Sequence, residues 1–253
     1  MFADTHCHLD FEQFDADRAL VLERSRQQGI EYIINVGSSL DASVRSVALA
    51  QEYASVYACV GIHPHEADSV DEQQVEEIRG LLTSEKVVAV GEIGLDYFKN
   101  FSRQDNQRTL FVQLLQVAKA ARLPLVLHSR EAGDDTLRIL KDFMPISAVL
   151  HCFSGDKKFL QECLDCGFFV SFTANITYKN AAALRELIPY VPLDRMFLET
   201  DAPYLAPEGM RGKRNEPMQV RAVAEQIALV LGRDVQDIGQ ITTQNAKRFF
   251  KIP

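Results

Sequence analysis

The chain has 253 residues, of which 47% are hydrophobic, and it carries a formal net charge of -8 at pH 7. A chain of this length buries roughly three quarters of its unfolded surface, so we expect one domain that spans residues 1–253. The net charge argues against broad nonspecific adhesion to nucleic acid, and no apolar stretch approaches the ~20 residues that a membrane helix requires.

Short apolar runs rich in β-branched residues alternate with helical patterns along the whole chain. One such helical pattern covers residues 107–122, where apolar side chains recur on one stripe. Near-continuous apolar strands joined by helices indicate a parallel sheet, and eight such units predict a TIM-type (β/α)8 barrel. The predicted strands are residues 2–6, 32–36, 57–62, 87–92, 125–128, 148–151, 168–172 and 195–200.

A doubly wound open sheet is the alternative fold, because hydrophobic periodicity does not distinguish it from a barrel. An open sheet would not bring residues of the first and last strands together. After the last strand, residues 202–217 contain several prolines and glycines and are predicted to form a loop, followed by a helix at 218–231. The final segment, 242–250, is expected to cover the outside of the barrel with Ala246, Phe249 and Phe250.

Histidines and acidic residues, which are common metal ligands, stand at the carboxyl ends of the predicted strands. This is the end at which barrel enzymes have their active sites. Side chains two apart on a strand point the same way, so His6 and His8 both face this end. Because imidazoles and carboxylates from several strands converge there, we predict a metal site. Its expected ligands are His6, His8, Glu92, His128, His151 and Asp201.

Six ligands exceed what one tetrahedral ion with an open position needs, but they suit two ions that share a bridging carboxylate. Glu92 lies midway in the strand order and is the predicted bridge. The mixture of nitrogen and oxygen ligands admits zinc, manganese or magnesium, so the cofactor is predicted as two divalent ions of open identity.

Other residues near the strand ends are candidates for chemistry. Asp201 is the predicted general base, and Glu199, on the same face of the strand, is expected to orient it. His63 is predicted to be catalytic, as a substrate contact or proton donor. His65 follows a strand-breaking proline and is expected to support the site from behind.

The segment from Arg211 to Arg214 is a candidate phosphate clamp, in which Arg211, Lys213 and Arg214 bind substrate; a solvated charged loop is the alternative. Arg130 is a weaker candidate for substrate binding, and a salt bridge to Glu131 is its alternative. Aromatic residues in the same loops would stack unpaired bases or simply pack at the rim. These are Tyr97, Phe98, Phe153, Tyr178 and Tyr204.

Several other functions are not supported by the sequence. Cys163 and Cys166 lack a second pair at zinc-ribbon spacing and are interpreted as reduced and structural. The Gly91-x-x-Gly94 pattern lacks the order of a dinucleotide fingerprint, so no nucleotide cofactor is expected. Five scattered cysteines and no signal peptide before Asp4 favour a cytoplasmic location without membrane contact.

Seven ordered motifs, spread over essentially the whole chain, resemble the TatD family of metal-dependent deoxyribonucleases. They are DTHCHLD at 4–10, VGIHPH at 60–65, GEIGLDY at 91–97, HSR at 128–130, HCFSG at 151–155, ETDAPYL at 199–205 and RGKRNEP at 211–217. The resemblance implies an amidohydrolase-type β/α barrel. It also implies one ion on His6, His8, Glu92 and Asp201, and a second on Glu92, His128 and His151.

By the same resemblance, the protein is expected to be an enzyme that cleaves DNA phosphodiester bonds with a two-metal-activated water, including 3′-5′ exonuclease action on single-stranded ends. A hydrolase of a carbonyl substrate, such as a lactone, an amide or an aminoacyl-tRNA ester, is the alternative, since fold and metals do not choose between carbon and phosphorus. A non-catalytic metal-binding or scaffold protein is the second alternative.

Overall fold

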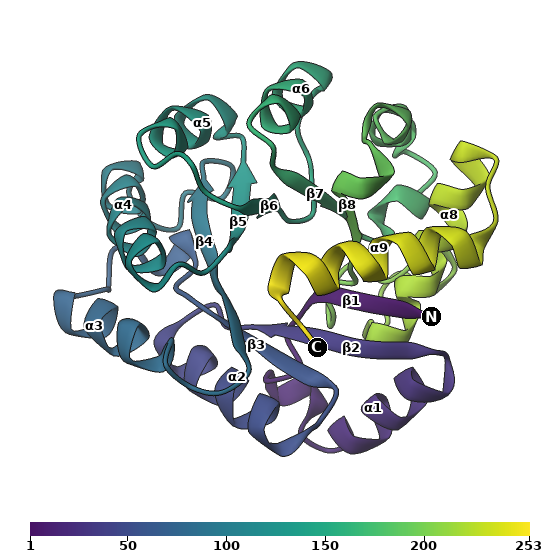
Figure 1. Ribbon diagram of the computed structural model, residues 1–253, viewed down its shortest axis with the longest axis horizontal. Helices are drawn as coiled ribbons and strands as arrows, with labels where there is room; N and C mark the ends of the chain where they lie inside the picture. Colours follow the sequence, from purple (N-terminus) through teal and green to yellow (C-terminus); the bar gives the residue numbers. More distant parts are fainter.

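Eight parallel strands pair with one another in chain order in the computed structural model, which describes residues 1–253 (Figure 1). An isolated parallel bridge between Cys7 and Ala202 links the first strand to the chain after the last. The sheet is therefore a nearly closed barrel, as predicted. The strands are β1 Phe2–Cys7, β2 Ile30–Val36, β3 Val56–Val60, β4 Val87–Asp96, β5 Leu125–Arg130, β6 Ala148–Leu150, β7 Phe169–Phe172 and β8 Met196–Leu198.

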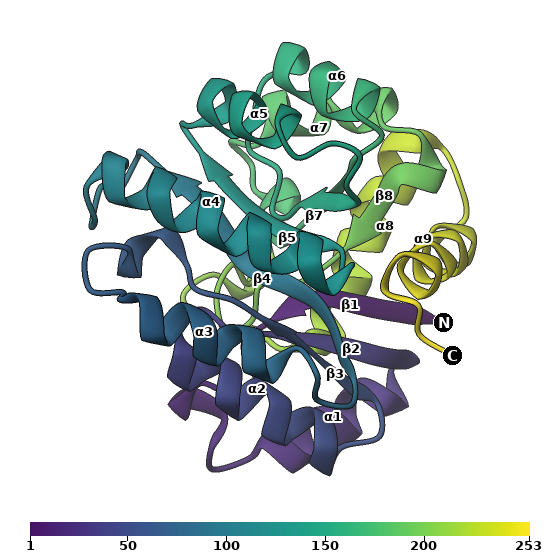
Figure 2. The same ribbon diagram turned by 60° about the vertical axis from the view of Figure 1, so that its left-hand side comes forward.

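Helices surround the strands in both views of the molecule (Figures 1 and 2). The helix predicted at 107–122 runs from Gln104 to Ala121, because its polar first turn carries no apolar period. None of the helices is both long and apolar enough to cross a lipid bilayer. They are α1 Arg18–Gln27, α2 Leu40–Glu52, α3 Glu72–Leu81, α4 Gln104–Ala121, α5 Gly133–Lys141, α6 Lys157–Asp165, α7 Ala182–Arg185, α8 Val220–Leu231 and α9 Val235–Phe250.

An aromatic cluster closes the end of the barrel at which the strands begin. Phe169 and Phe197 stack at 4.7 Å between ring centroids, and Phe249 and Phe250 of α9 lie 5.2 and 5.9 Å from Phe197. Ala246, Phe249 and Phe250 belong to the core cluster that small and β-branched residues of the strands form. They thus pack against this inner core, not on the outside of the barrel as expected. We call the four phenylalanines the aromatic floor.

The opposite end, which we call the mouth, is formed by the carboxyl ends of the strands and the loops that follow them. Closure of the barrel joins β1 and β8 there: Asp201 N donates to His6 O at 2.8 Å, and His8 N donates to Ala202 O at 2.7 Å. Asp201 adopts a left-handed backbone with φ of 57°, which these two hydrogen bonds hold. The first and last strands thus bring their polar side chains together.

Candidate metal centre

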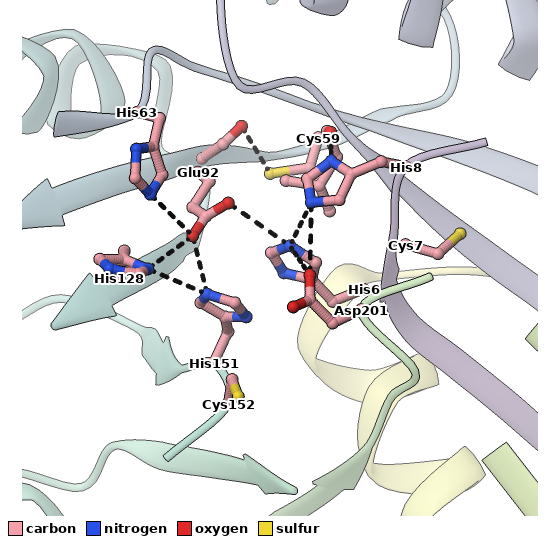
Figure 3. Close-up of polar contacts among 12 residues, drawn as sticks. His6, Cys7, His8, Cys59, His63, Glu92, His128, His151, Cys152 and Asp201 are labelled. Carbon is pink, nitrogen blue, oxygen red and sulfur yellow. Dashed lines mark hydrogen bonds and ion pairs between the residues drawn. The ribbon is translucent and has the colours of Figure 1, made fainter. Parts of the chain in front are cut away.

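One group of ligand atoms lies where β1 meets β8. His6 Nε2 lies 3.3 Å from His8 Nε2 and 3.5 Å from Glu92 Oε2. Asp201 Oδ1 lies 3.4 Å from His8 Nε2 and 3.9 Å from His6 Nε2 (Figure 3). Two imidazoles and two carboxylates therefore converge on one small volume, as the spacing of His6 and His8 predicts.

A second group lies on the other side of Glu92. His128 Nδ1 and His151 Nε2 lie 2.8 and 2.7 Å from Glu92 Oε1, and 3.3 Å from each other. His63 Nε2 lies 3.5 Å from the same oxygen (Figure 3). The two oxygens of Glu92 thus face two separate sets of nitrogen atoms, which is the arrangement that a bridging carboxylate has between two ions.

The charges of the centre suit divalent cations. Four carboxylates are clustered at the mouth, and none of them forms an ion pair with lysine or arginine. Their cationic partners are imidazoles, whose nitrogens also bind ions such as zinc or manganese. A buried carboxylate without a cation is costly, so this donor set fits metal ions. The four are Glu92, Asp96, Glu199 and Asp201; Asp4, buried beside them, has no cationic partner, and burial raises its pKa well above its usual range.

The pKa values of the ligands reflect two opposing influences, burial and the charges of neighbouring side chains. Burial alone would raise the pKa of Glu92, but the charges of His151 and His63 and hydrogen bonds from His128 and His151 hold it well below its usual range. Burial is the largest influence on His8 and lowers its pKa, but the hydrogen bond to Asp201 and the charges of Asp201, Glu92 and Asp10 together outweigh burial and raise the pKa to about 9. An ion at His8 therefore displaces a proton, so metal binding tightens as pH rises.

Neighbouring groups orient the imidazoles from behind. His8 Nδ1 donates to Val36 O at 2.7 Å, which turns Nε2 toward Asp201. His128 Nε2 lies 3.2 Å from Asp96 Oδ2, which turns Nδ1 toward Glu92. Such hydrogen bonds on the second ring nitrogen commonly fix the orientation of metal-binding histidines. His6 Nδ1 is buried and has no such partner.

Glu199 lies in a different place from the one expected. Its Oε1 accepts a hydrogen bond from Cys152 N at 2.6 Å and lies 3.4 Å from His151 Nδ1. It therefore supports His151, not Asp201. The reason is that Asp201 leaves the strand in a left-handed conformation, so the alternation of side chains along β8 does not extend to it.

The two histidines of the VGIHPH motif separate into different positions. His63 is close enough to Glu92 and His128 to serve as a ligand with them, in addition to the catalytic role expected from the sequence. His65 Nε2 lies 2.9 Å from Asp96 Oδ2 and does not reach Glu92. His65 thus supports the site through Asp96, which also holds His128.

Two carboxylates of the site are absent from the sequence-based set. Asp96 was missed because β4 was expected to end at Glu92, whereas the strand continues through Asp96 with a shifted register against β5. Asp4 accepts hydrogen bonds from Thr200 N at 2.9 Å and Thr200 Oγ1 at 2.6 Å and so ties β1 to the end of β8. A strand-end position for Asp96 and the DTHCHLD motif for Asp4 were the available signals.

We call residues 211–214 the basic loop. One of its three cations, Arg214, is held in ion pairs within the protein, and the other two are exposed. Arg214 donates to both oxygens of Asp17 and to Glu216, and its guanidinium lies over the Phe14 ring. The hydrogen bond from Arg214 lowers the pKa of Asp17 to about 2. Arg211 lies over the Tyr178 ring at 4.5 Å and 3.8 Å from a carboxylate oxygen of Glu208, and its side chain is 57% exposed. Lys213 is exposed and lines the same hollow.

A cavity of about 720 Å³ opens above the two groups of ligands, with Arg130, Lys99 and Tyr204 in its wall. Arg130 lies 3.9 Å over the Phe98 ring and makes no salt bridge to Glu131. The basic loop lines a separate hollow of about 380 Å³, which shares Tyr204 and Leu205 with the cavity. Of the predicted substrate residues, Arg130 thus lies in the wall of the cavity, and those of the basic loop line the neighbouring hollow.

Comparison with known proteins agrees with these features. Residues 3–251 match the family model described as TatD related DNase. The chain belongs to the TatD family. It is 40% identical, over the full length of both chains, to the uncharacterized metal-dependent hydrolase YabD of Bacillus subtilis. It is 35% identical to the 3′-5′ ssDNA/RNA exonuclease TatD of Pectobacterium carotovorum, over 98% of this chain and 99% of that protein.

Solved structures of the family share this fold. YjjV, a TatD homologue from Escherichia coli, superposes with a TM-score of 0.93 at 34% identity, over 100% of this chain and 98% of that one. A TatD family hydrolase from Entamoeba histolytica gives a TM-score of 0.89 at 22% identity, over 98% and 97% of the two chains, and shares the barrel architecture. As a TatD member, the protein is a metal-dependent hydrolase.

Proposed function

We propose that this TatD protein is a two-metal phosphodiesterase that hydrolyses nucleic acid, with DNA as its main substrate and single-stranded 3′ ends as the preferred site. The position of Glu92 carries the proposal, because its two oxygens face separate sets of histidines. Two adjacent ions suit the in-line displacement at phosphorus, in which attacking and leaving oxygens both need stabilisation. Relatives that are named 3′-5′ ssDNA/RNA exonucleases, at 35% and 37% identity, support this substrate class.

His6, His8, Glu92 and Asp201 would hold one ion, and Glu92, His128 and His151 the other. Bound there, divalent ions would supply the acidity that activates a water and the positive charge that stabilises the phosphoryl oxygens. Burial raises the pKa of Asp201, but the hydrogen bond from His8 and the nearby imidazoles bring it below its usual range. The carboxylate is therefore ionised at neutral pH and accepts the proton of the attacking water.

His63 contacts the scissile phosphate or the leaving oxygen in this proposal. Its side chain lies in the wall of the cavity, next to Glu92. Burial lowers the pKa of His63 well below its usual range. Nδ1 of the neutral imidazole accepts a hydrogen bond from His65 N at 3.2 Å, so Nε2 carries the N–H and offers it to an oxygen of the substrate. Arg130, Arg211 and Lys213 would bind the flanking phosphates.

The decisive experiment supplies metal and substrate separately. Metal-stripped protein would receive Mg²⁺, Mn²⁺ or Zn²⁺ singly and be assayed on labelled single- and double-stranded DNA, RNA and a panel of lactones, amides and esters. We expect hydrolysis of single-stranded DNA to return with at least one metal. Turnover confined to carbonyl substrates would refute the phosphodiesterase, and no turnover with any metal would favour a scaffold.

A further inference from the structure

Exposed aromatic side chains gather at the mouth of the barrel. Four aromatic residues are about half exposed or more: Phe98 at 49%, Phe101 at 67%, Tyr190 at 50% and Tyr204 at 52%. Phe98 and Phe101 follow β4, and Tyr204 follows β8, whereas Tyr190 lies between α7 and β8 with its ring against Lys157 at the start of α6. Exposed apolar groups that cluster beside a cavity mark a surface that binds something.

Cations accompany the two phenylalanines. The guanidinium of Arg130 lies 3.9 Å over the Phe98 ring, and Lys99 Nζ lies 5.7 and 5.9 Å from the rings of Phe98 and Phe101. Lys99 and Arg130 also line the cavity above the metal centre. The Phe101 ring contacts His65 edge-on at 4.8 Å. We call Phe98, Lys99, Phe101 and Arg130 the β4 rim. It adjoins the candidate metal centre, because Lys99 and Arg130 belong to the wall of the cavity above it.

The charges around the mouth define a path. Phe98, Lys99 and Phe101 of the β4 rim follow β4, and Arg130 ends the neighbouring strand β5. The exposed cations Arg211 and Lys213 follow β8, which stands opposite β4 in an eight-stranded barrel. Between α5 and α6 the mouth is instead lined by five carboxylates, which repel a polyanion, although Lys158 and the ion pairs of Asp135 and Glu162 offset part of their charge. The five are Glu131, Asp134, Asp135, Asp156 and Glu162. A polyanion therefore crosses the metal centre between the two cationic sides.

We propose that the β4 rim is a stacking platform for the unpaired bases of single-stranded nucleic acid, on the far side of the metal centre from Arg211 and Lys213. This inference rests on the proposed function. Phe98 and Phe101 stack on successive bases, while Lys99 and Arg130 pair with the phosphates between them. Bases within a duplex already stack on one another, so the rim selects single strands.

The test measures binding separately from hydrolysis. A fluorescein-labelled oligothymidylate is titrated with protein in EDTA, to prevent cleavage, and anisotropy is recorded. The double variant Phe98→Leu, Phe101→Leu keeps apolar side chains but removes both rings. We expect it to bind at least roughly tenfold more weakly than wild type, with unchanged melting temperature and metal content. The matched control is Tyr190→Leu, which removes an equally exposed ring that also carries a lysine, Lys157 at 3.6 Å, but that belongs to neither the β4 rim nor the wall of the cavity.

Equal binding of oligothymidylate by the double variant and wild type would overturn the inference and assign the exposed rings to a protein contact. Equal binding of duplex and single strand by wild type would also overturn it. Hydrolysis of bis(4-nitrophenyl) phosphate by metal-loaded wild type tests the proposed function alone. If wild type cleaves no phosphodiester but oligothymidylate binding still depends on the two rings, the platform stands and the proposed reaction fails.

Discussion

At the aromatic floor, four phenylalanine rings pack against one another, whereas at the mouth the same barrel ends in imidazoles and carboxylates. The rings of the floor bury apolar area and carry no polar atom, so they stabilise the fold. The mouth buries carboxylates that have only imidazoles as cationic partners, which costs stability until a metal ion binds. Residues that stabilise the barrel and residues that serve its chemistry are thus separated along the strands.

The largest expected effect follows from removing the carboxylate that joins the two groups of ligands. Glu92→Ala should abolish hydrolysis and lower the content of both metals, because both groups are deprived of a shared ligand. The barrel should stay folded, since the freed imidazoles can become neutral. Metal analysis, circular dichroism and a nuclease assay check this. Full activity in the variant would refute the bridging role of Glu92.

A smaller effect is expected from Asp201→Asn. The amide keeps an oxygen for the ion but cannot accept a proton at neutral pH, so kcat should fall by ~10²–10⁴ with metal retained. The comparison of kcat with metal content under single-turnover conditions checks this. If metal content falls in proportion to activity, Asp201 is mainly a ligand. Normal turnover with full metal would reject both roles.

A substitution in the aromatic floor should lower stability and leave catalysis unchanged, the opposite of the effect expected at the mouth. Phe197→Ala removes the ring that contacts all three other rings of the floor, and we expect it to lower the free energy of unfolding by about 3–5 kcal/mol. The value of kcat per folded molecule should not change. Denaturant unfolding and active-site titration check the two quantities, and Phe197→Leu should cost less. A fall in kcat with unchanged stability would contradict the separation of the two ends.

The barrel was predictable because most of the strands are short, mainly apolar runs and polar residues lie at or just after their ends. The ligands followed from that rule: His6, His128 and His151 lie at the mouth as expected. The partners of each side chain did not follow, because they depend on register and backbone conformation. The shifted register of β4 places Asp96 next to His128. Because the backbone turns left-handed at Asp201, Glu199 lies next to His151 and not beside Asp201.

The basic loop shows the same limit on prediction and allows the finest test of the comparison. Within four residues, Arg214 has a structural role like that of the floor, since Asp17 and Glu216 occupy its donors, whereas Arg211 and Lys213 are exposed at the hollow next to the cavity. Sequence alone assigned all three residues to phosphate, because it does not reveal that the start of α1 presents Asp17 to the loop.

Two sets of variants separate these roles. In Arg211→Ala, Lys213→Ala, the KM for single-stranded DNA should rise, and the slope of log affinity against log salt should flatten by about 0.7 for each phosphate that the variant no longer neutralises. Arg214→Ala should leave that slope unchanged and lower stability by about 1 kcal/mol, because it detaches the loop from α1. Metal content should be normal in both. A salt slope that flattens only in Arg214→Ala would mean that substrate displaces Asp17 from this arginine, and the loop would then belong entirely to the mouth.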